Sequence, residues 1–152
     1  MIIDEKEKGE INKFDLNAGY VPQKTFLIDD TIEANIALGI KKNNINKENI
    51  EECLKLSNLI SDFKDTKLSL DTQVGENGVQ VSIGQAQRIS IARALYNNPD
   101  IIILDEATNS LDEISEKIIF ENLHKLKKIK TVILVTHKED NLKYCDDIIS
   151  LN

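Results

Sequence analysis

Apolar residues recur at helical spacing along the first two-thirds of the chain. Segment 30–39 predicts a short helix with Asp30 as its N-terminal cap and Gly39 as its stop. A second helix is expected over about 46–63, because apolar residues repeat there every three or four positions. Segment 70–78 is rich in turn-forming residues and predicts a loop.

A third helix is expected to begin at Ser82 and to stop before Pro99, because proline disfavours helical backbone in the residue that precedes it. Its inward side is predicted from the spacing of its small and apolar residues. That side comprises Ile83, Ala86, Ser90, Ile91, Ala94 and Leu95.

Beyond Pro99 the pattern changes to alternating strands and helices. Segment 101–104 is a run of four apolar residues, three of them β-branched, which suits a strand covered on both faces. A helix over 112–128 and a strand over 131–135 follow, then a short helical turn over 139–143 and a final strand over 148–151. Alternation of this kind predicts an α/β fold whose parallel sheet binds ligands at the carboxyl ends of its strands.

Composition limits the class of protein. The 152 residues are 41% hydrophobic and 30% charged, and they carry a formal net charge of −7, which suits one domain or part of a larger one. Neither a bilayer-spanning apolar run nor a secretory signal is present, so we expect a cytosolic chain. The negative charge disfavours nucleic acid as a partner, since such binding depends on Lys and Arg. A bound nucleotide is compatible with it.

The two cysteines show no metal-ligand spacing. Cys53 falls on one helical stripe with Ile50, Leu54 and Ile60, and we interpret both Cys53 and Cys145 as reduced and structural.

Two predicted strands end in residues that suit catalysis or metal binding. Asp105 and Glu106 follow the apolar run 101–104, and His137 follows the strand 131–135. Adjacent carboxylates at the end of a buried strand are costly to desolvate, which favours a cation nearby. The alternative is an acidic pair that caps the next helix, and the acids alone do not decide between these interpretations.

Other motifs surround this acidic pair. Ser82-Ile83-Gly84-Gln85 opens a predicted helix, whose free N–H groups and dipole can receive a phosphate. Gln23 lies upstream, and the segment 109–112 lies directly downstream. Each has an ordinary structural interpretation: Gln23 as a turn residue, and Ser82 and Asp112 as helix caps. Their order along one chain is hard to explain by chance.

Together these residues resemble the nucleotide-binding domain of ATP-binding-cassette (ABC) transporters. Segment 20–23 is similar to the Q-loop, 81–88 to the signature sequence, 101–106 to the Walker B strand and 110–112 to the D-loop, with His137 as the switch histidine. Segments 29–39 and 70–78 further resemble the exporter branch.

The resemblance implies a fold and a domain layout. The fold would be a partial P-loop NTPase-like parallel sheet core with an inserted helical subdomain at about 25–97. Segments 1–24 and 98–152 would form the α/β core.

The resemblance also implies ATP and Mg²⁺ as ligands. Asp105 would hold magnesium, with Gln23 as a second ligand that reports γ-phosphate to the membrane partner. Glu106 would polarise the attacking water, and His137 would contact the γ-phosphate. The signature and D-loop residues would act across a head-to-tail dimer of two nucleotide-binding domains: Ser82, Gly84 and Gln85 on the other subunit's nucleotide, and Asp112 between the two sites.

Two departures from the family pattern bear on activity. Ile83 occupies a position where the signature usually has glycine, which crowds the approach to phosphate. The 152 residues also contain no G-x-x-x-x-G-K-[S/T] loop, which cradles the β- and γ-phosphates. We therefore expect a fragment that does not hydrolyse ATP by itself.

Three hypotheses follow. The first is the motor domain of an exporter, located in the cytoplasm at the inner face of the membrane and bound to a transmembrane domain. The second is an ABC protein of chromosome maintenance or repair. It is disfavoured because a long coiled coil separates Q-loop from signature in those proteins, whereas a short helical segment does so here. The third is a non-catalytic remnant that binds a partner.

Overall fold

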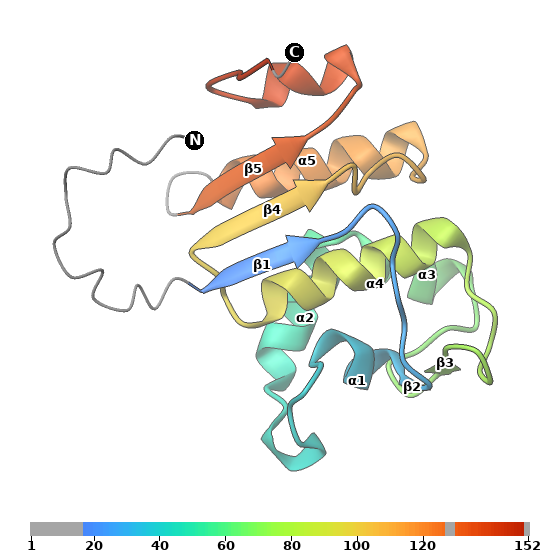
Figure 1. The fold of residues 1–152 in the computed structure, drawn as a ribbon. Coiled ribbons are helices and arrows are strands. Elements are labelled where there is room, and N and C mark those ends of the chain that lie inside the picture. The colour runs from blue at the N-terminus through green and yellow to red at the C-terminus, as the bar shows by residue number, and fades with distance from the viewer. Residues whose placement is uncertain (1–16, 127–129, 151–152) are drawn as a thin grey trace, which may run out of the picture.

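The computed structural model describes residues 17–126 and 130–150, which form a three-stranded parallel sheet with helices beside it (Figure 1). The strands lie in the order β1 (Ala18–Val21), β4 (Ile101–Asp105) and β5 (Thr131–Val135). Val21 is level with Leu104, and Leu104 with Leu134, so the three carboxyl ends meet at one edge. The other elements are β2 (Asp30–Thr31), α1 (Ile32–Ile36), η1 (Lys42–Asn44), α2 (Lys47–Leu56), α3 (Leu59–Asp65), β3 (Gln73–Val74), α4 (Ile83–Tyr96), α5 (Glu113–Leu126) and η2 (Glu139–Tyr144).

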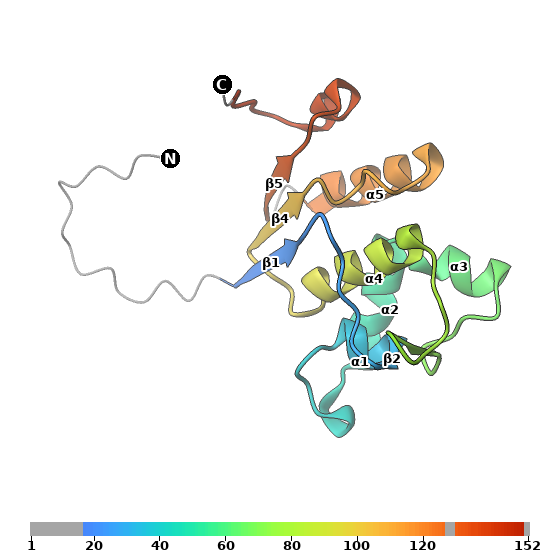
Figure 2. The same ribbon diagram turned by 45° about the vertical axis from the view of Figure 1, so that its right-hand side comes forward.

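Helices α4 and α5 lie on the same side of the sheet, as Figure 2 shows. On that side Ile102 and Leu104 are at most 1% exposed, and they belong to one core with Ile119. On the opposite face Tyr20 is 54% and Ile133 45% exposed. The α/β fold is confirmed, but the prediction that strand 101–104 is covered on both faces is wrong for the described residues, because their helices cover one face.

Helix α4 packs closely on β1 because Gly19 has no side chain. A Cβ at Gly19 would lie 2.2 Å from the carbonyl oxygen of Ala94, which no substitution could accommodate without moving the helix. The predicted start of this helix is confirmed, with Ser82 as its cap. The prediction of its inward side is wrong at Ile83, which begins the helix and is 76% exposed, whereas Ile89 is fully buried.

The first predicted helix is shorter than expected and has a different cap. The hydroxyl of Thr31 accepts the N–H of Ala34 and caps α1, while the carboxylate of Asp30 accepts the N–H of Thr31 instead. The prediction that Asp30 caps this helix is therefore wrong. Residue Asp30 belongs to β2, which pairs antiparallel with β3 inside the segment 70–78. The sequence predicts only a loop there, because two-residue strands are too short to show a sequence period.

The predicted helix 46–63 is divided into α2 and α3. Asn46 caps α2 by accepting the N–H groups of Glu48 and Asn49. Asn58 has φ 57 and breaks the helix, since asparagine tolerates left-handed backbone better than most residues. The break changes the direction of the chain, so that α3 packs against α4 and carries Asp62 to Arg88.

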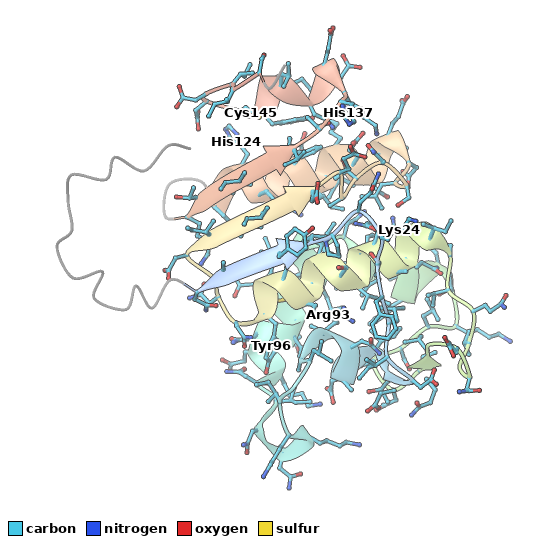
Figure 3. The ribbon with its side chains drawn as sticks, in the orientation of Figure 1. Lys24, Arg93, Tyr96, His124, His137 and Cys145 are labelled. Atoms are coloured by element: carbon cyan, nitrogen blue, oxygen red, sulfur yellow. The ribbon has the colours of Figure 1, made fainter. Side chains whose placement is uncertain are left out.

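The cysteines differ in burial. Cys53 is 3% exposed in the core, as predicted, and burial raises the pKa of its thiol to about 12. Cys145 is also a free thiol and is half-buried. In Figure 3 it lies above β5, near the C-terminal end of the described chain.

The C-terminal segment departs from its prediction. The helical turn is confirmed as η2. A strand over 148–151 is wrong for residues 148–150, which have no regular structure, and position 151 lies outside the described residues. Ile148 and Ile149 are 59% and 85% exposed, so this apolar run lacks a strand to pair with among the described residues. Helix α5 ends at Leu126, and positions 127 and 128 of its predicted range lie outside the described residues.

None of the helices that the structure describes combines the length and the apolarity that a membrane span requires.

Candidate functional site

The carboxylate of Glu106 lies at the centre of a polar cluster at the carboxyl edge of the sheet. The side-chain amide of Gln23 donates to its Oε2 over 2.6 Å, and Nε2 of His137 lies 2.5 Å from its Oε1. The amide of Asn109 donates to Oε2 over 3.1 Å. Figure 3 shows His137 and Lys24 at this edge. The structure therefore brings together three residues that the sequence predicted to share a site.

Glu106 has an unusual backbone. Its φ of 49 lies in the left-handed region, which a residue with a long side chain adopts at a cost. Its N–H donates to the carbonyl of Val135 over 3.0 Å, which continues the pairing of β4 with β5 by one residue. This geometry turns the chain sharply after β4 and directs the carboxylate toward Gln23 and His137.

Asp105 is held separately from its neighbour. The hydroxyl of Tyr20 donates to its Oδ2 over 2.9 Å. This hydrogen bond, together with desolvation and the negative charge of Asp105, raises the pKa of Tyr20. Among the described residues no donor reaches the other oxygen of Asp105. Within the described part of the chain, that oxygen could therefore accept a hydrogen bond from water or bind a cation.

The donor set suits magnesium bound together with a phosphate ligand. No group of three or more His, Cys, Asp or Glu side chains within residues 17–126 and 130–150 could enclose a metal ion. Mg²⁺ prefers oxygen ligands and keeps most of its water, so it commonly binds one or two carboxylates and substrate phosphates rather than a protein cage. Asp105 with the side-chain oxygen of Gln23 could supply that kind of site.

The signature residues form the start of α4. The hydroxyl of Ser82 accepts the N–H of Gln85 over 3.1 Å, and the side chain of Gln85 accepts the N–H of Ser82 over 2.9 Å. This capping box fixes the first helical turn. The structural interpretation of Ser82 as a helix cap is thus correct, and the turn it fixes is the one predicted to meet a phosphate.

The loop 109–112 contacts both the acidic edge of the sheet and the signature turn at the start of α4. At one end of the loop, the side-chain amide of Asn109 donates to Glu106. Further along, the carbonyl oxygen of Ser110 lies so close to Gly84 that a Cβ added at position 84 would be 3.3 Å from it. Any side chain at position 84 would press on this loop, so glycine permits the close approach. The signature turn and the acidic edge are therefore linked through one short segment.

Asp112 caps α5, as one of its two interpretations predicted. Its Oδ1 accepts the N–H of Ser115 over 2.9 Å. The hydrogen bonds from Ser115, first of all from its backbone, lower the pKa of Asp112, and the charge of Arg88 adds to this.

Residues outside the predicted site hold its parts in place. The side chain of Gln87 donates to the carbonyl of Pro22 over 3.2 Å and accepts the hydroxyl of Thr25 over 2.8 Å. Since Gln87 is 1% exposed on α4, it anchors the segment that carries Gln23. Sequence reasoning assigned no role to Gln87 or Tyr20. For Tyr20 the sequence held no signal, because its place level with Ile103 follows from a strand pairing that the sequence did not predict.

A parallel sheet with an acidic pair at its carboxyl edge, beside a capped helix N-terminus, defines an α/β domain of the nucleotide-binding class. Residues 2–109 match the family model described as ABC transporter, and the chain belongs to this family. The resemblance inferred from its motifs is confirmed.

Among the proteins similar to this chain are a flippase and several exporters. The chain is 41% identical over 133 residues to an ATP-dependent lipid A-core flippase of Colwellia psychrerythraea, covering 88% of this chain and 23% of that protein. It is 42% identical over 131 residues to a putative multidrug export ATP-binding/permease protein of Staphylococcus aureus, with coverages of 86% and 22%. The solved structure of a bacterial Atm1-family ABC exporter with ATP bound matches with a TM-score of 0.73 and 32% identity, over 82% of this chain and 22% of that one. The chain thus spans under a quarter of these proteins' length.

Proposed function

We propose that the chain is the part of an ABC exporter's ATPase domain that binds magnesium, activates water and presents the signature turn. The observation that carries this proposal is the carboxylate of Glu106, held between Gln23 and His137 at the carboxyl edge of the sheet with Asp105 beside it. The names of the exporter relatives support the same function.

Each residue at the edge has a distinct role in this proposal. Asp105 would hold Mg²⁺ through water, with Gln23 as second ligand, and the bound ion would supply positive charge beside the phosphates of ATP. Glu106 accepts a proton from the attacking water, and a positioned base of this kind contributes about 10² to 10⁴ in rate. His137, whose side chain is 83% exposed, exchanges its contact with Glu106 for one with the γ-phosphate.

The signature turn acts on a second nucleotide-binding domain. Ser82, Gly84 and Gln85 contact the nucleotide bound by the other domain of a head-to-tail dimer, and Asp112 lies between the two sites. A transmembrane domain of the exporter is the other partner, which places the assembled domain in the cytoplasm at the inner face of the membrane. Exposed Ile83, at the start of α4, would face the partner's γ-phosphate.

A non-catalytic remnant is the second candidate function. It is favoured by one observation: the 152 residues contain no glycine-rich loop with a lysine to hold the triphosphate. Catalysis of phosphoryl transfer consists mostly of placement, so a base without a bound substrate achieves little. Both candidates therefore predict that this chain alone does not hydrolyse ATP.

The deciding experiment adds a phosphate-binding loop to the chain. The chain is joined to the preceding part of the ATPase domain of the flippase that is 41% identical to it, and phosphate release is measured with Mg²⁺ and ATP. We expect turnover from the joined protein. Glu106→Gln in it should keep ATP binding but lower the rate by at least about 100-fold, as expected for loss of a positioned base.

The unmodified chain and its Glu106→Gln variant serve as controls, after circular dichroism has shown that both fold. Equal background rates are expected from the two. An unmodified chain that clearly outpaces its variant would reveal a substitute phosphate site. A joined protein that binds ATP but releases no phosphate would favour the remnant.

A further inference from the structure

A second carboxylate with several donors lies inside the molecule, away from the acidic edge. Asp62 on α3 is 8% exposed and Arg88 on α4 is 7% exposed. Nε of Arg88 donates to Oδ2 of Asp62 over 2.8 Å, and Nη2 donates to Oδ1 over 2.9 Å. The pair is thus bidentate, which fixes the plane of the guanidinium group.

The remaining contacts of this pair reach the starts of two helices. The side-chain amide of Gln85 donates to Oδ1 of Asp62 over 3.2 Å, while its oxygen accepts from the backbone of Ser82. Nη1 of Arg88 donates to the hydroxyl of Ser115 over 3.0 Å and lies 3.8 Å from Oδ2 of Asp112. One carboxylate therefore connects α3 with the first turn of α4 and the first turn of α5.

Stability alone does not account for this arrangement. A buried ion pair is often no more stable than apolar side chains of the same volume, because both charges lose their hydration. What apolar side chains cannot supply is direction, since a hydrogen bond fixes the orientation of each group that it joins. Every buried side-chain nitrogen and oxygen of the described residues has a partner, so the cluster is fully satisfied.

We infer that Asp62 is a positioning residue, which through Gln85 and Arg88 fixes the signature turn relative to the loop 109–112. The inference about position depends on geometry alone, and its role in ATP hydrolysis depends on the proposed function. In the proposed dimer both the turn and the loop would contact the second nucleotide-binding domain. A fixed position of one relative to the other therefore fixes the shape of the surface that this domain contacts.

Hydrogen–deuterium exchange of the full chain tests the inference without any ATPase activity. In Asp62→Asn we expect the backbone amides of Gln85 and Ser115 to exchange about tenfold faster or more. The substitution removes the charge that Gln85 and Arg88 bind, so the hydrogen bonds that order the two helix turns become weaker. Exchange in β4 should stay unchanged. Glu33→Gln is the matched control, because Glu33 is also a buried acid with a lysine partner, Lys47, but belongs to α1.

A double variant separates positioning from stability. Asp62→Leu with Arg88→Met removes both charges and keeps the volume filled, so its unfolding midpoint should return close to that of the parent chain. The backbone amides of Gln85 and Ser115 should nevertheless still exchange faster than in the parent chain. Recovery of their protection together with the midpoint would overturn the inference, as would unchanged exchange in Asp62→Asn. Either result can be obtained whether or not the joined protein hydrolyses ATP.

Discussion

Glu106 and Asp62 are both carboxylates held by several side-chain donors, but their surroundings differ. The donors of Glu106 come from the open edge of the sheet, where the side chain of His137 is 83% exposed. The donors of Asp62 come from the interior, where the side chain of Arg88 is 9% exposed. The side chains of the two acids are themselves similarly buried, 16% and 10% exposed, so the clusters differ in the access of their donors to water.

Access to water determines what each cluster can do. An exposed donor that leaves Glu106 is solvated at once, so a ligand phosphate can replace the carboxylate at little cost. A buried donor that loses Asp62 has no substitute, and its desolvation remains uncompensated. The edge cluster is thus suited to exchange partners during a reaction, and the interior cluster to keep its partners throughout.

The largest expected effect is on stability when the interior cluster is broken. Arg88→Ala leaves Asp62 buried without its cation, which should lower the free energy of unfolding by about 3–5 kcal/mol. His137→Ala breaks the equivalent contact at the edge and should change it by less than about 0.5 kcal/mol. Urea denaturation of both variants checks the contrast, and similar losses in the two would show that exposure does not distinguish the clusters.

A smaller effect is expected from the backbone at the edge. Glu106→Ala and Glu106→Gly both remove the carboxylate, but only glycine adopts the φ of 49 without strain. The glycine variant should therefore be more stable than the alanine variant by about 1–2 kcal/mol. Thermal or urea unfolding measures the difference. Equal stability would mean that position 106 leaves the left-handed region once its side chain is removed.

The smallest expected effect concerns Asp112, which lies between the two clusters and is exposed. Asp112→Ala removes the cap of α5 and should cost about 1 kcal/mol at pH 7. The hydrogen bonds from Ser115 lower the pKa of Asp112 below its ordinary value of 3.8. The stabilisation by its charge is therefore complete above that value and is lost as the pH falls through the lower value of the folded state.

Urea titrations of the parent chain and of Asp112→Ala between pH 7 and pH 3 test this sign. The gap between the two unfolding midpoints should narrow toward acid. A gap that widens would show that the neutral acid is the better cap. Asp112→Asn serves as control, because asparagine caps well and does not titrate in this range.

Much of the fold could be predicted because the responsible signals are local. The apolar run at 101–104 and the proline at position 99 placed β4 and the end of α4, and Ser82 marked the start of that helix. Elements without a local signal were missed. The strand at 18–21 is too short to show a period and exists through its pairing with β4. The break at Asn58 was missed as well, because a single asparagine tolerates the left-handed backbone found there but does not by itself mark the end of a helix.

The rule that ligands bind at the carboxyl ends of parallel strands grouped Glu106 with His137, and the family resemblance added Gln23 to them. Asp62 could not be found in this way. It belongs to an ordinary amphipathic stretch, and its meaning arises from the turn that brings α3 against α4. The spacing of Ile83 predicts a core position, which is wrong because spacing does not reveal where a helix ends relative to its neighbours.

The unequal burial of the two thiols makes the chain easy to label at one position. Cys53 is enclosed by the core, and its pKa of about 12 keeps it protonated and slow to react with maleimides near neutral pH. Cys145 is half-buried beyond η2, which follows directly on His137 and Lys138. A fluorophore attached there would report on rearrangements near His137 without the need to engineer a cysteine or to remove one.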